Sequence, residues 1–289
     1  MYAITGITGK VGGALARTLL AQGHKVRAVL RDESKAGAWR DQGCEIAQAE
    51  MDNAVSLASA FQGATGVFIL PPSEFDPQPG FPEAQAVIDA VRTALVEARP
   101  RKVVCLSTIG ADAPHKNLLS QRTLMEQALA GLGLPVTFLR PGWFMENALW
   151  DVAAARDEGV LHSFLEPADK QFPMIATRDV GSLAAQLLTE EWDGLRIVDL
   201  EGPARISPND LAQAFSVALG RAVRVQLVPR ETWEALFTSQ GAKNPLPRIR
   251  MLDGFNESWI EFRDGGRWAV KGETPLATVI AELVAASAA

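Results

Sequence analysis

Tyrosine, cysteine and histidine are all scarce in this 289-residue chain, which contains one, two and three of them. The single tyrosine is Tyr2, in the first apolar stretch, so no tyrosine further along the chain can act as a proton donor. Both cysteines, Cys44 and Cys105, lie in apolar segments that predict buried strands or their edges, as reduced thiols do. No set of histidines, cysteines and carboxylates has the spacing of a metal site.

Positive charge and long apolar runs are lacking as well. The chain has 28 lysines and arginines against 34 acidic residues, a formal net charge of -6 and a pI near 5.3. Without a uniform basic field, neither nucleic acid nor an anionic membrane is an expected partner. No apolar stretch approaches the ~18 residues of a membrane-spanning helix, and the first residues lack the features of a signal peptide. We therefore expect a cytoplasmic protein, a monomer or a homodimer, that acts on a small molecule.

What the sequence does contain is a repeating βα pattern up to about residue 140. Short apolar runs predict strands, and the segments between them have helical periodicity and end at glycines such as Gly23 and Gly43. The predicted strands are Tyr2–Thr5, Lys25–Leu30, Cys44–Ala49, Gly66–Leu70, Lys102–Thr108 and Pro135–Arg140. This α/β pattern predicts a doubly wound parallel sheet of the Rossmann type. Its ligand site is expected above the first and fourth strands, where the strand order reverses.

The pattern loosens in the second half of the chain. A helix is predicted at Thr177–Thr189, a strand at Leu195–Leu200, and a helix at Ser207–Leu219 that Ser207 caps. We expect a dinucleotide-binding domain over residues 1–150 and a smaller substrate lobe over residues 151–289, some of whose elements complete the sheet. Six of the seven tryptophans lie beyond residue 140, which suits a lobe that lines an apolar pocket, although for any single one an ordinary core position is the favoured interpretation.

Glycines are concentrated directly after the first predicted strand, in the stretch TGITGKVGG. Gly6 can make the tight turn, Gly9 lets the backbone approach a pyrophosphate, and Gly12 lets the following helix pack against the sheet. The N-terminus of that helix would attract the phosphates. A turn that needs glycine only for its backbone is the alternative. The flanking residues expected to contribute contacts are Thr5, Thr8, Lys10 and Val11.

The residue at the end of the second predicted strand is Arg31, where an acidic side chain would bind the ribose hydroxyls of NAD. An arginine there pairs instead with the 2′-phosphate of NADP(H), with Lys35 as a second cation. Asp32 follows immediately, so NAD stays open as an alternative.

Six further stretches resemble one known family in their sequence and order. Together with the glycine stretch, RAVLRD, AEMDN, VFILPPS, STIGAD, LRPGWFMENAL and TRDVGSLAAQLL make the chain similar to the NmrA-like, atypical short-chain dehydrogenase/reductase family. The resemblance includes NADPH-dependent quinone reductases and iminium reductases of the ergot-alkaloid type. It implies an NADP-binding core in which Asp52 and Asn53 lie near the adenine and Leu70, Pro71 and Pro72 under the ribose and phosphates. It places Ser107, Thr108, Pro141, Gly142 and Phe144 toward the nicotinamide.

The wider superfamily uses a tyrosine and a lysine as its catalytic pair, and this chain has neither at the expected place. Arg122 stands where the lysine would fall, with Glu126 one turn later; a surface pair between these two is the alternative. Arginine is too basic to donate a proton. His115, on the loop after the fifth strand, is a second weak candidate, and a solvated loop histidine is the plainer interpretation. The catalytic residue is therefore unknown.

Two functions remain open. The first is an oxidoreductase that passes hydride from NADPH to a planar apolar quinone, enone or iminium ion, because such acceptors need little help from an acid. Its substrate contacts are expected from Ser73, Phe75, Trp143, Phe144 and Trp233. The second is a redox sensor that binds NADP(H) and a partner protein without turnover, which the missing tyrosine favours. The stretch GAKNPLPRIR at residues 241–250 is either a flap over the pocket or a plain surface connection.

Overall fold

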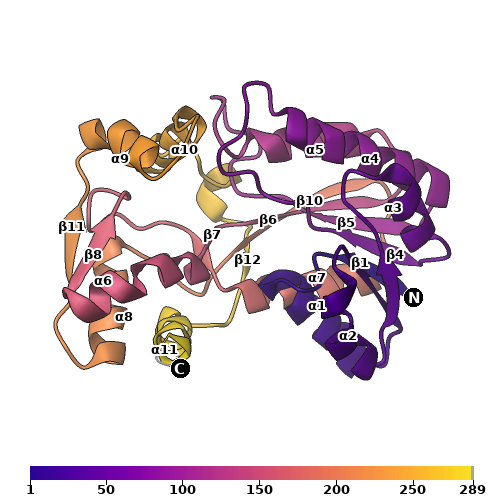
Figure 1. Ribbon diagram of the computed structural model, residues 1–289, viewed down its shortest axis with the longest axis horizontal. Helices are drawn as coiled ribbons and strands as arrows, with labels where there is room; N and C mark the ends of the chain where they lie inside the picture. Colours follow the sequence, from indigo (N-terminus) through magenta and orange to yellow (C-terminus); the bar gives the residue numbers. More distant parts are fainter. Residues whose placement is uncertain (288–289) are drawn as a thin grey trace.

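The computed structural model describes residues 1–287 and is built around one eight-stranded parallel sheet (Figure 1). Its strand order is β12-β10-β6-β5-β4-β1-β2-β3. The six strands predicted from the sequence are all present, with ends that differ by a residue or two, and the doubly wound sheet is confirmed. The strands are β1 (Tyr2–Thr5), β2 (Val26–Leu30), β3 (Glu45–Gln48), β4 (Gly66–Ile69), β5 (Lys102–Leu106), β6 (Val136–Pro141), β10 (Leu195–Glu201) and β12 (Val270–Lys271).

Helices cover both faces of this sheet (Figure 1). Successive strand residues point to opposite faces, so Ile4 packs with one layer of helices and Ala3 with the other. A Cβ on Gly181 would lie 2.7 Å from the Leu15 nitrogen, so glycine is required where two helices of one layer cross. That layer contains α1 (Lys10–Ala21), α2 (Gly37–Asp41) and α7 (Thr177–Thr189), and the opposite layer contains α3 (Ala54–Phe61), α4 (Pro82–Ala98) and α5 (Ser120–Ala130).

A smaller lobe lies beyond the β6 and β10 side of the sheet (left in Figure 1). Its core is aromatic and includes Phe215, Phe237 and Phe255. At its border, β7 (Trp143–Phe144) pairs with β9 (Met174–Ile175). The other elements are η2 (Met145–Asp151), α6 (Val152–Asp157), β8 (Val160–Ser163), α8 (Pro208–Leu219), β11 (Arg224–Leu227), η3 (Arg230–Thr232), α9 (Trp233–Ser239), α10 (Leu246–Asn256), η4 (Arg263–Gly266) and α11 (Leu276–Ala286).

The chain returns from this lobe to the sheet more than once. Helix α7 packs on α1, and β10 and β12 extend the sheet beyond β6. The domain boundary near residue 150 therefore stays a prediction. In the structure, several elements that follow this residue belong to the sheet domain.

Local signals explain the two helices predicted beyond residue 150. Helix α7 has the predicted bounds, and α8 begins one residue after its cap. The Ser207 hydroxyl accepts from the Asp210 backbone at 3.1 Å, and the Asp210 carboxylate accepts from the Ser207 backbone at 2.8 Å. Within residues 1–287, every helix is too short or too polar to cross a membrane.

Candidate active site

The carboxyl ends of β1 and β4 lie side by side, and the strand order reverses between them. Thr5 joins the two strands, because its hydroxyl donates to the Phe68 carbonyl at 3.1 Å and accepts from the Leu70 backbone at 2.8 Å. Its side chain is only 1% exposed. Thr5 was expected to offer a hydroxyl to the cofactor, and this expectation is corrected: the hydroxyl is used within the sheet.

The turn between β1 and α1 is tight and is built from closely packed glycines. Gly6 has φ +64°, and the Gly9 backbone donates to the Gly6 carbonyl at 3.0 Å. A Cβ on Gly12 would lie 2.3 Å from the same carbonyl oxygen. Helix α1 starts without an acidic residue in its first turn, and no side chain within residues 1–287 caps its first N–H groups. The exposed residues beside them are Thr8, Gly9 and Lys10, whereas the Val11 side chain is buried and leaves only its backbone for a ligand.

Two neighbouring charged residues at the end of β2, Arg31 and Asp32, differ in their contacts. The Asp32 carboxylate accepts from the backbone and the hydroxyl of Ser34, at 3.0 and 2.6 Å. These bonds hold the pKa of Asp32 below its usual value and commit one carboxylate oxygen, Oδ1, to the start of η1 (Glu33–Lys35). Arg31 and Lys35 are exposed, and neither guanidinium nor ammonium has a polar partner within residues 1–287. The cations are thus available for a phosphate, while Oδ2 of Asp32 also has no partner within residues 1–287, so the NAD alternative stays open.

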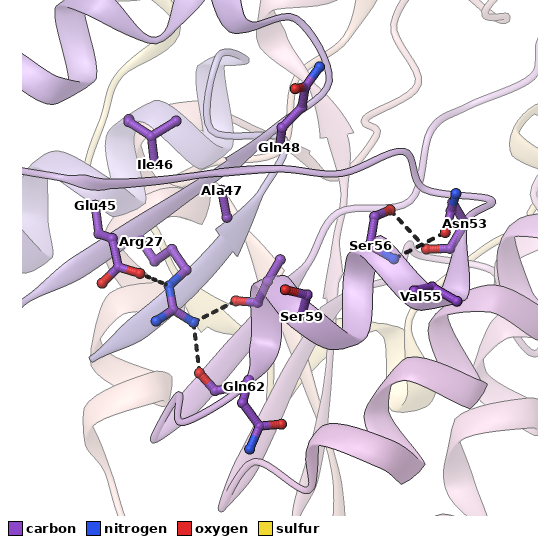
Figure 2. Close-up of a pocket in the computed structure, with 11 residues that line it drawn as sticks. Arg27, Glu45, Ile46, Ala47, Gln48, Asn53, Val55, Ser56, Ser59 and Gln62 are labelled. Carbon is purple, nitrogen blue, oxygen red and sulfur yellow. Dashed lines mark hydrogen bonds and ion pairs between the residues drawn. The ribbon is translucent and has the colours of Figure 1, made fainter.

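Asn53 and Asp52 follow β3, and Asn53 has a structural task. Its side chain accepts from the Ser56 backbone at 3.0 Å and caps α3. Beside it runs a groove of about 740 Å³ between β3 and α3 (Figure 2). At the far end of this groove Arg27 bonds Glu45 at 2.6 Å and two backbone carbonyls at 2.8 Å (Figure 2). The groove follows the edge of the sheet and does not include the glycine turn.

A buried charged network joins the loop after β5 to helix α5 and strand β6. The Ser107 hydroxyl donates to Glu126, which also accepts two bonds from Arg140, at 2.9 and 2.7 Å. Arg140 reaches Asp112 at 2.8 Å. Glu126 is 8% exposed, so the surface pair between Arg122 and Glu126 considered from the sequence is wrong. The network fixes the loop that begins at Ser107, next to Thr108, Pro141 and Phe144.

Arg122 binds the loop after β4 instead. Its guanidinium donates to the carbonyls of Pro71 and Pro72, at 2.9 and 3.2 Å, and to the Ser73 hydroxyl at 2.8 Å. Burial lowers its pKa to about 10, so it remains charged at neutral pH. The other weak candidate, His115, is exposed and lies edge-on to Trp259, with 5.1 Å between ring centroids.

Four of the five residues predicted to contact the substrate have accessible side chains. Ser73 and Phe75 are exposed, and Trp143 and Phe144 are half-buried at the border of the lobe. Trp233 is 0% exposed, so the prediction for this residue is corrected. Its indole donates to the Val228 carbonyl at 2.8 Å, and its ring packs on Phe164 inside the lobe core. The physical reason is the size of its apolar ring, which the small lobe needs to fill its own centre.

Comparison with known proteins identifies the family of this chain. A model of the NmrA-like family matches residues 2–258. The chain belongs to the NmrA-like family. Quinone oxidoreductase 2 of Escherichia coli (strain K12) is 28% identical to this family member over 249 residues, 85% of this chain and 84% of that one. NAD(P)H azoreductase of Xenophilus azovorans is 28% identical over 259 residues, 89% and 85% of the two chains.

Solved structures show the same fold as this NmrA-like protein. The crystal structure of the NADPH-dependent quinone oxidoreductase QOR2 from Escherichia coli, complexed with NADPH, has a TM-score of 0.81 to it at 24% sequence identity. The likeness covers 98% of this chain and 99% of that one. The family model confirms the resemblance drawn from the sequence, and the structural likeness confirms the fold.

Sequence reasoning missed two groups in this NmrA-like protein. One is the buried network of Glu126 and Arg140, whose only signal was a charged residue inside an apolar strand. The other is Asp76, whose carboxylate accepts from the backbones of Lys243 and Asn244 at 2.8 and 2.7 Å. The stretch at residues 241–250 therefore reaches the loop after β4, and a plain surface connection does not describe it.

Proposed function

We propose that this protein is an NADPH-dependent oxidoreductase that passes a hydride to a small, planar and largely apolar acceptor. The observation that carries the proposal is the turn at Gly6–Gly12, where close-packed glycines and the open N-terminus of α1 suit a pyrophosphate. Arg31 supports NADPH over NADH, because its exposed guanidinium has no polar partner within residues 1–287 and can pair with a 2′-phosphate.

The remaining cofactor contacts are proposed from the loops that follow β4, β5 and β6. When bound, NADPH supplies the hydride. Leu70, Pro71 and Pro72 leave β4 beside the glycine turn and suit the ribose and phosphates. Ser107 is held by Glu126, and this buried bond gives the loop a fixed position toward the nicotinamide end. The other contacts proposed for this end are Thr108, Pro141 and Phe144.

The proposed class of acceptor follows from the proton donor that the site lacks. The only tyrosine is buried in β1, and Arg122 keeps its proton at neutral pH because its pKa is about 10. An acceptor that takes hydride without a strong acid beside it suits such a site, which favours quinones, activated alkenes and iminium ions. The quinone and azo specificities in the relatives' names support the same class and add azo compounds to it. The proposed acceptor walls are Ser73, Phe75, Trp143 and Phe144.

Oxidation of NADPH by a panel of quinones, activated alkenes, iminium ions and azo dyes tests the proposal. We expect turnover with at least one class, and weaker binding of NADH than of NADPH by calorimetry. Tight NADPH binding without turnover of any acceptor would replace this proposal by the redox sensor, which the missing tyrosine favours. An absence of binding to either dinucleotide would overturn both.

A further inference from the structure

The loop between β4 and α4, residues 70–81, is fastened to the sheet domain along one side. Arg122 of α5 holds three of its acceptors, as described above. On the same helix, the Gln121 amide donates to the Glu74 carbonyl at 2.9 Å. The end of the loop is also constrained, since Phe81 has φ +60° and is 2% exposed. The Lys116 ammonium lies 4.8 Å from the centre of its ring.

The other side of the same loop is fastened to the lobe through Asp76. The two carboxylate oxygens accept from consecutive backbone N–H groups, those of Lys243 and Asn244. The Asn244 side chain donates to the Pro77 carbonyl at 2.7 Å. These bonds hold the pKa of Asp76 below its usual value, because they favour the charged carboxylate. The connection thus has the form of a charge-assisted clamp.

The clamped turn leads directly into the wall of the proposed acceptor pocket. Residues 243–244 immediately precede α10, and Phe255 of that helix packs edge-on against Trp143 with 5.2 Å between centroids. A second backbone bond, from the Leu118 nitrogen to the Pro247 carbonyl at 2.9 Å, ties the start of α10 to the loop after β5. Asp76 therefore sits at one end of a continuous chain of contacts that ends at Trp143.

We propose that Asp76 is a positioning residue that sets the width of the acceptor pocket by holding the lobe, through α10, against the loop after β4. This inference rests on the proposed oxidoreductase function. Asp76 itself does not touch the glycine turn, and Arg122 holds Pro71 and Pro72 without it, so its loss should spare NADPH binding. Removing the clamp lets α10 and Trp143 move away from the loop after β4, which weakens binding of the acceptor.

The test compares Asp76→Ala with Asp76→Asn, which keeps one acceptor oxygen, and with Asp89→Ala as a matched control. Asp89 is an exposed aspartate of α4 without a polar side-chain contact within residues 1–287. For Asp76→Ala we expect the KM of the best acceptor to rise about tenfold, with kcat changed less and the Kd of NADPH within about twofold of wild type. Asp76→Asn should give a smaller rise, and Asp89→Ala none.

Hydrogen exchange on the full chain provides a readout that does not depend on turnover. The backbone N–H groups of Lys243 and Asn244 should exchange faster in Asp76→Ala, and less so in Asp76→Asn, while those of α1 stay as protected as in wild type. Unchanged exchange at these positions, or an acceptor KM equal to that of Asp89→Ala, would overturn the clamp. If the alanine variant fails to fold, the same criteria apply to Asp76→Asn. A wild-type protein that turns over no acceptor but shows the exchange effect would refute the proposed function and leave the contact itself established.

Discussion

The turn at Gly6–Gly12 and the loop at residues 71–77 follow the carboxyl ends of the neighbouring strands β1 and β4, but different interactions hold them. The turn is made of backbone and consists of neighbouring residues, with Gly12 against the Gly6 carbonyl. The loop is held by side chains and backbone from distant segments, namely Arg122 of α5 and the 243–244 turn of the lobe. The comparison teaches that the proposed phosphate end is formed by neighbouring residues, whereas the proposed acceptor end is assembled from separate segments.

The largest expected effect tests which lobe aromatics belong to the core. Trp233→Ala should lower the free energy of unfolding by about 4 kcal/mol, because the ring is fully buried and leaves a cavity. Trp143→Ala is the matched variant, and we expect it to raise the acceptor KM with a smaller loss of stability. Chemical denaturation measures both. If Trp233→Ala were stable and Trp143→Ala were not, the assignment of the two residues would have to be exchanged.

Gly12→Ala tests whether the turn at Gly6–Gly12 binds the phosphates of the cofactor. The added Cβ would meet the Gly6 carbonyl at 2.3 Å, so the turn must open, and we expect the Kd of NADPH to rise about 100-fold. Gly37→Ala is the control, since Gly37 has open space around its Cβ position and no positive φ. Calorimetric titration gives both constants. Equal affinity in the two variants would show that the turn does not hold the cofactor.

Arg31→Ala sharpens the choice of dinucleotide. Loss of a charge-assisted pair with the 2′-phosphate should raise the Kd of NADPH about 30-fold and leave that of NADH nearly unchanged. Arg40→Ala removes an exposed arginine of the neighbouring α2 as a control. The ratio of the two dissociation constants is the decisive quantity, and a ratio that Arg31→Ala does not change contradicts the assignment.

The smallest effect concerns Asp151, at the end of η2 where the chain enters the lobe. Burial raises the pKa of this carboxyl from 3.8 to about 7, so the folded protein prefers its protonated form. The native state then binds more protons than the unfolded state between about pH 4 and pH 7, and stability must fall as the pH rises through this range. Asp151→Asn should therefore be more stable than wild type at about pH 8 and equally stable at about pH 4. The full shift corresponds to about 4 kcal/mol, and we expect about 1–2 kcal/mol because the carboxylate is only half-buried and is screened by solvent. Thermal unfolding at the two pH values measures the difference, and an equal gain at both would point to a cause other than titration.

Most of the sheet domain was predictable because its signals are local. A strand such as β1 appears as a short apolar run between turn residues, and α8 is announced by its serine cap and its first-turn proline. The glycine turn and the exposed Arg31 follow β1 and β2 as the sequence predicted, while their roles toward a cofactor stay predictions. Trp233, Thr5 and the partner of Glu126 were misjudged, since each depends on which distant group lies nearest after folding.

The sequence by itself determined the order of strands and helices, the turn at Gly6–Gly12 and the membership of a family, because backbone geometry and short-range periodicity act over a few residues. Only the tertiary structure decided that Arg140 pairs with Glu126, that Arg122 binds the loop after β4, and that Asp76 reaches residues 243–244, more than 160 positions away. A buried charge pairs with the group that packing brings within hydrogen-bond distance. For these residues, the spacing along the chain does not predict which group that is.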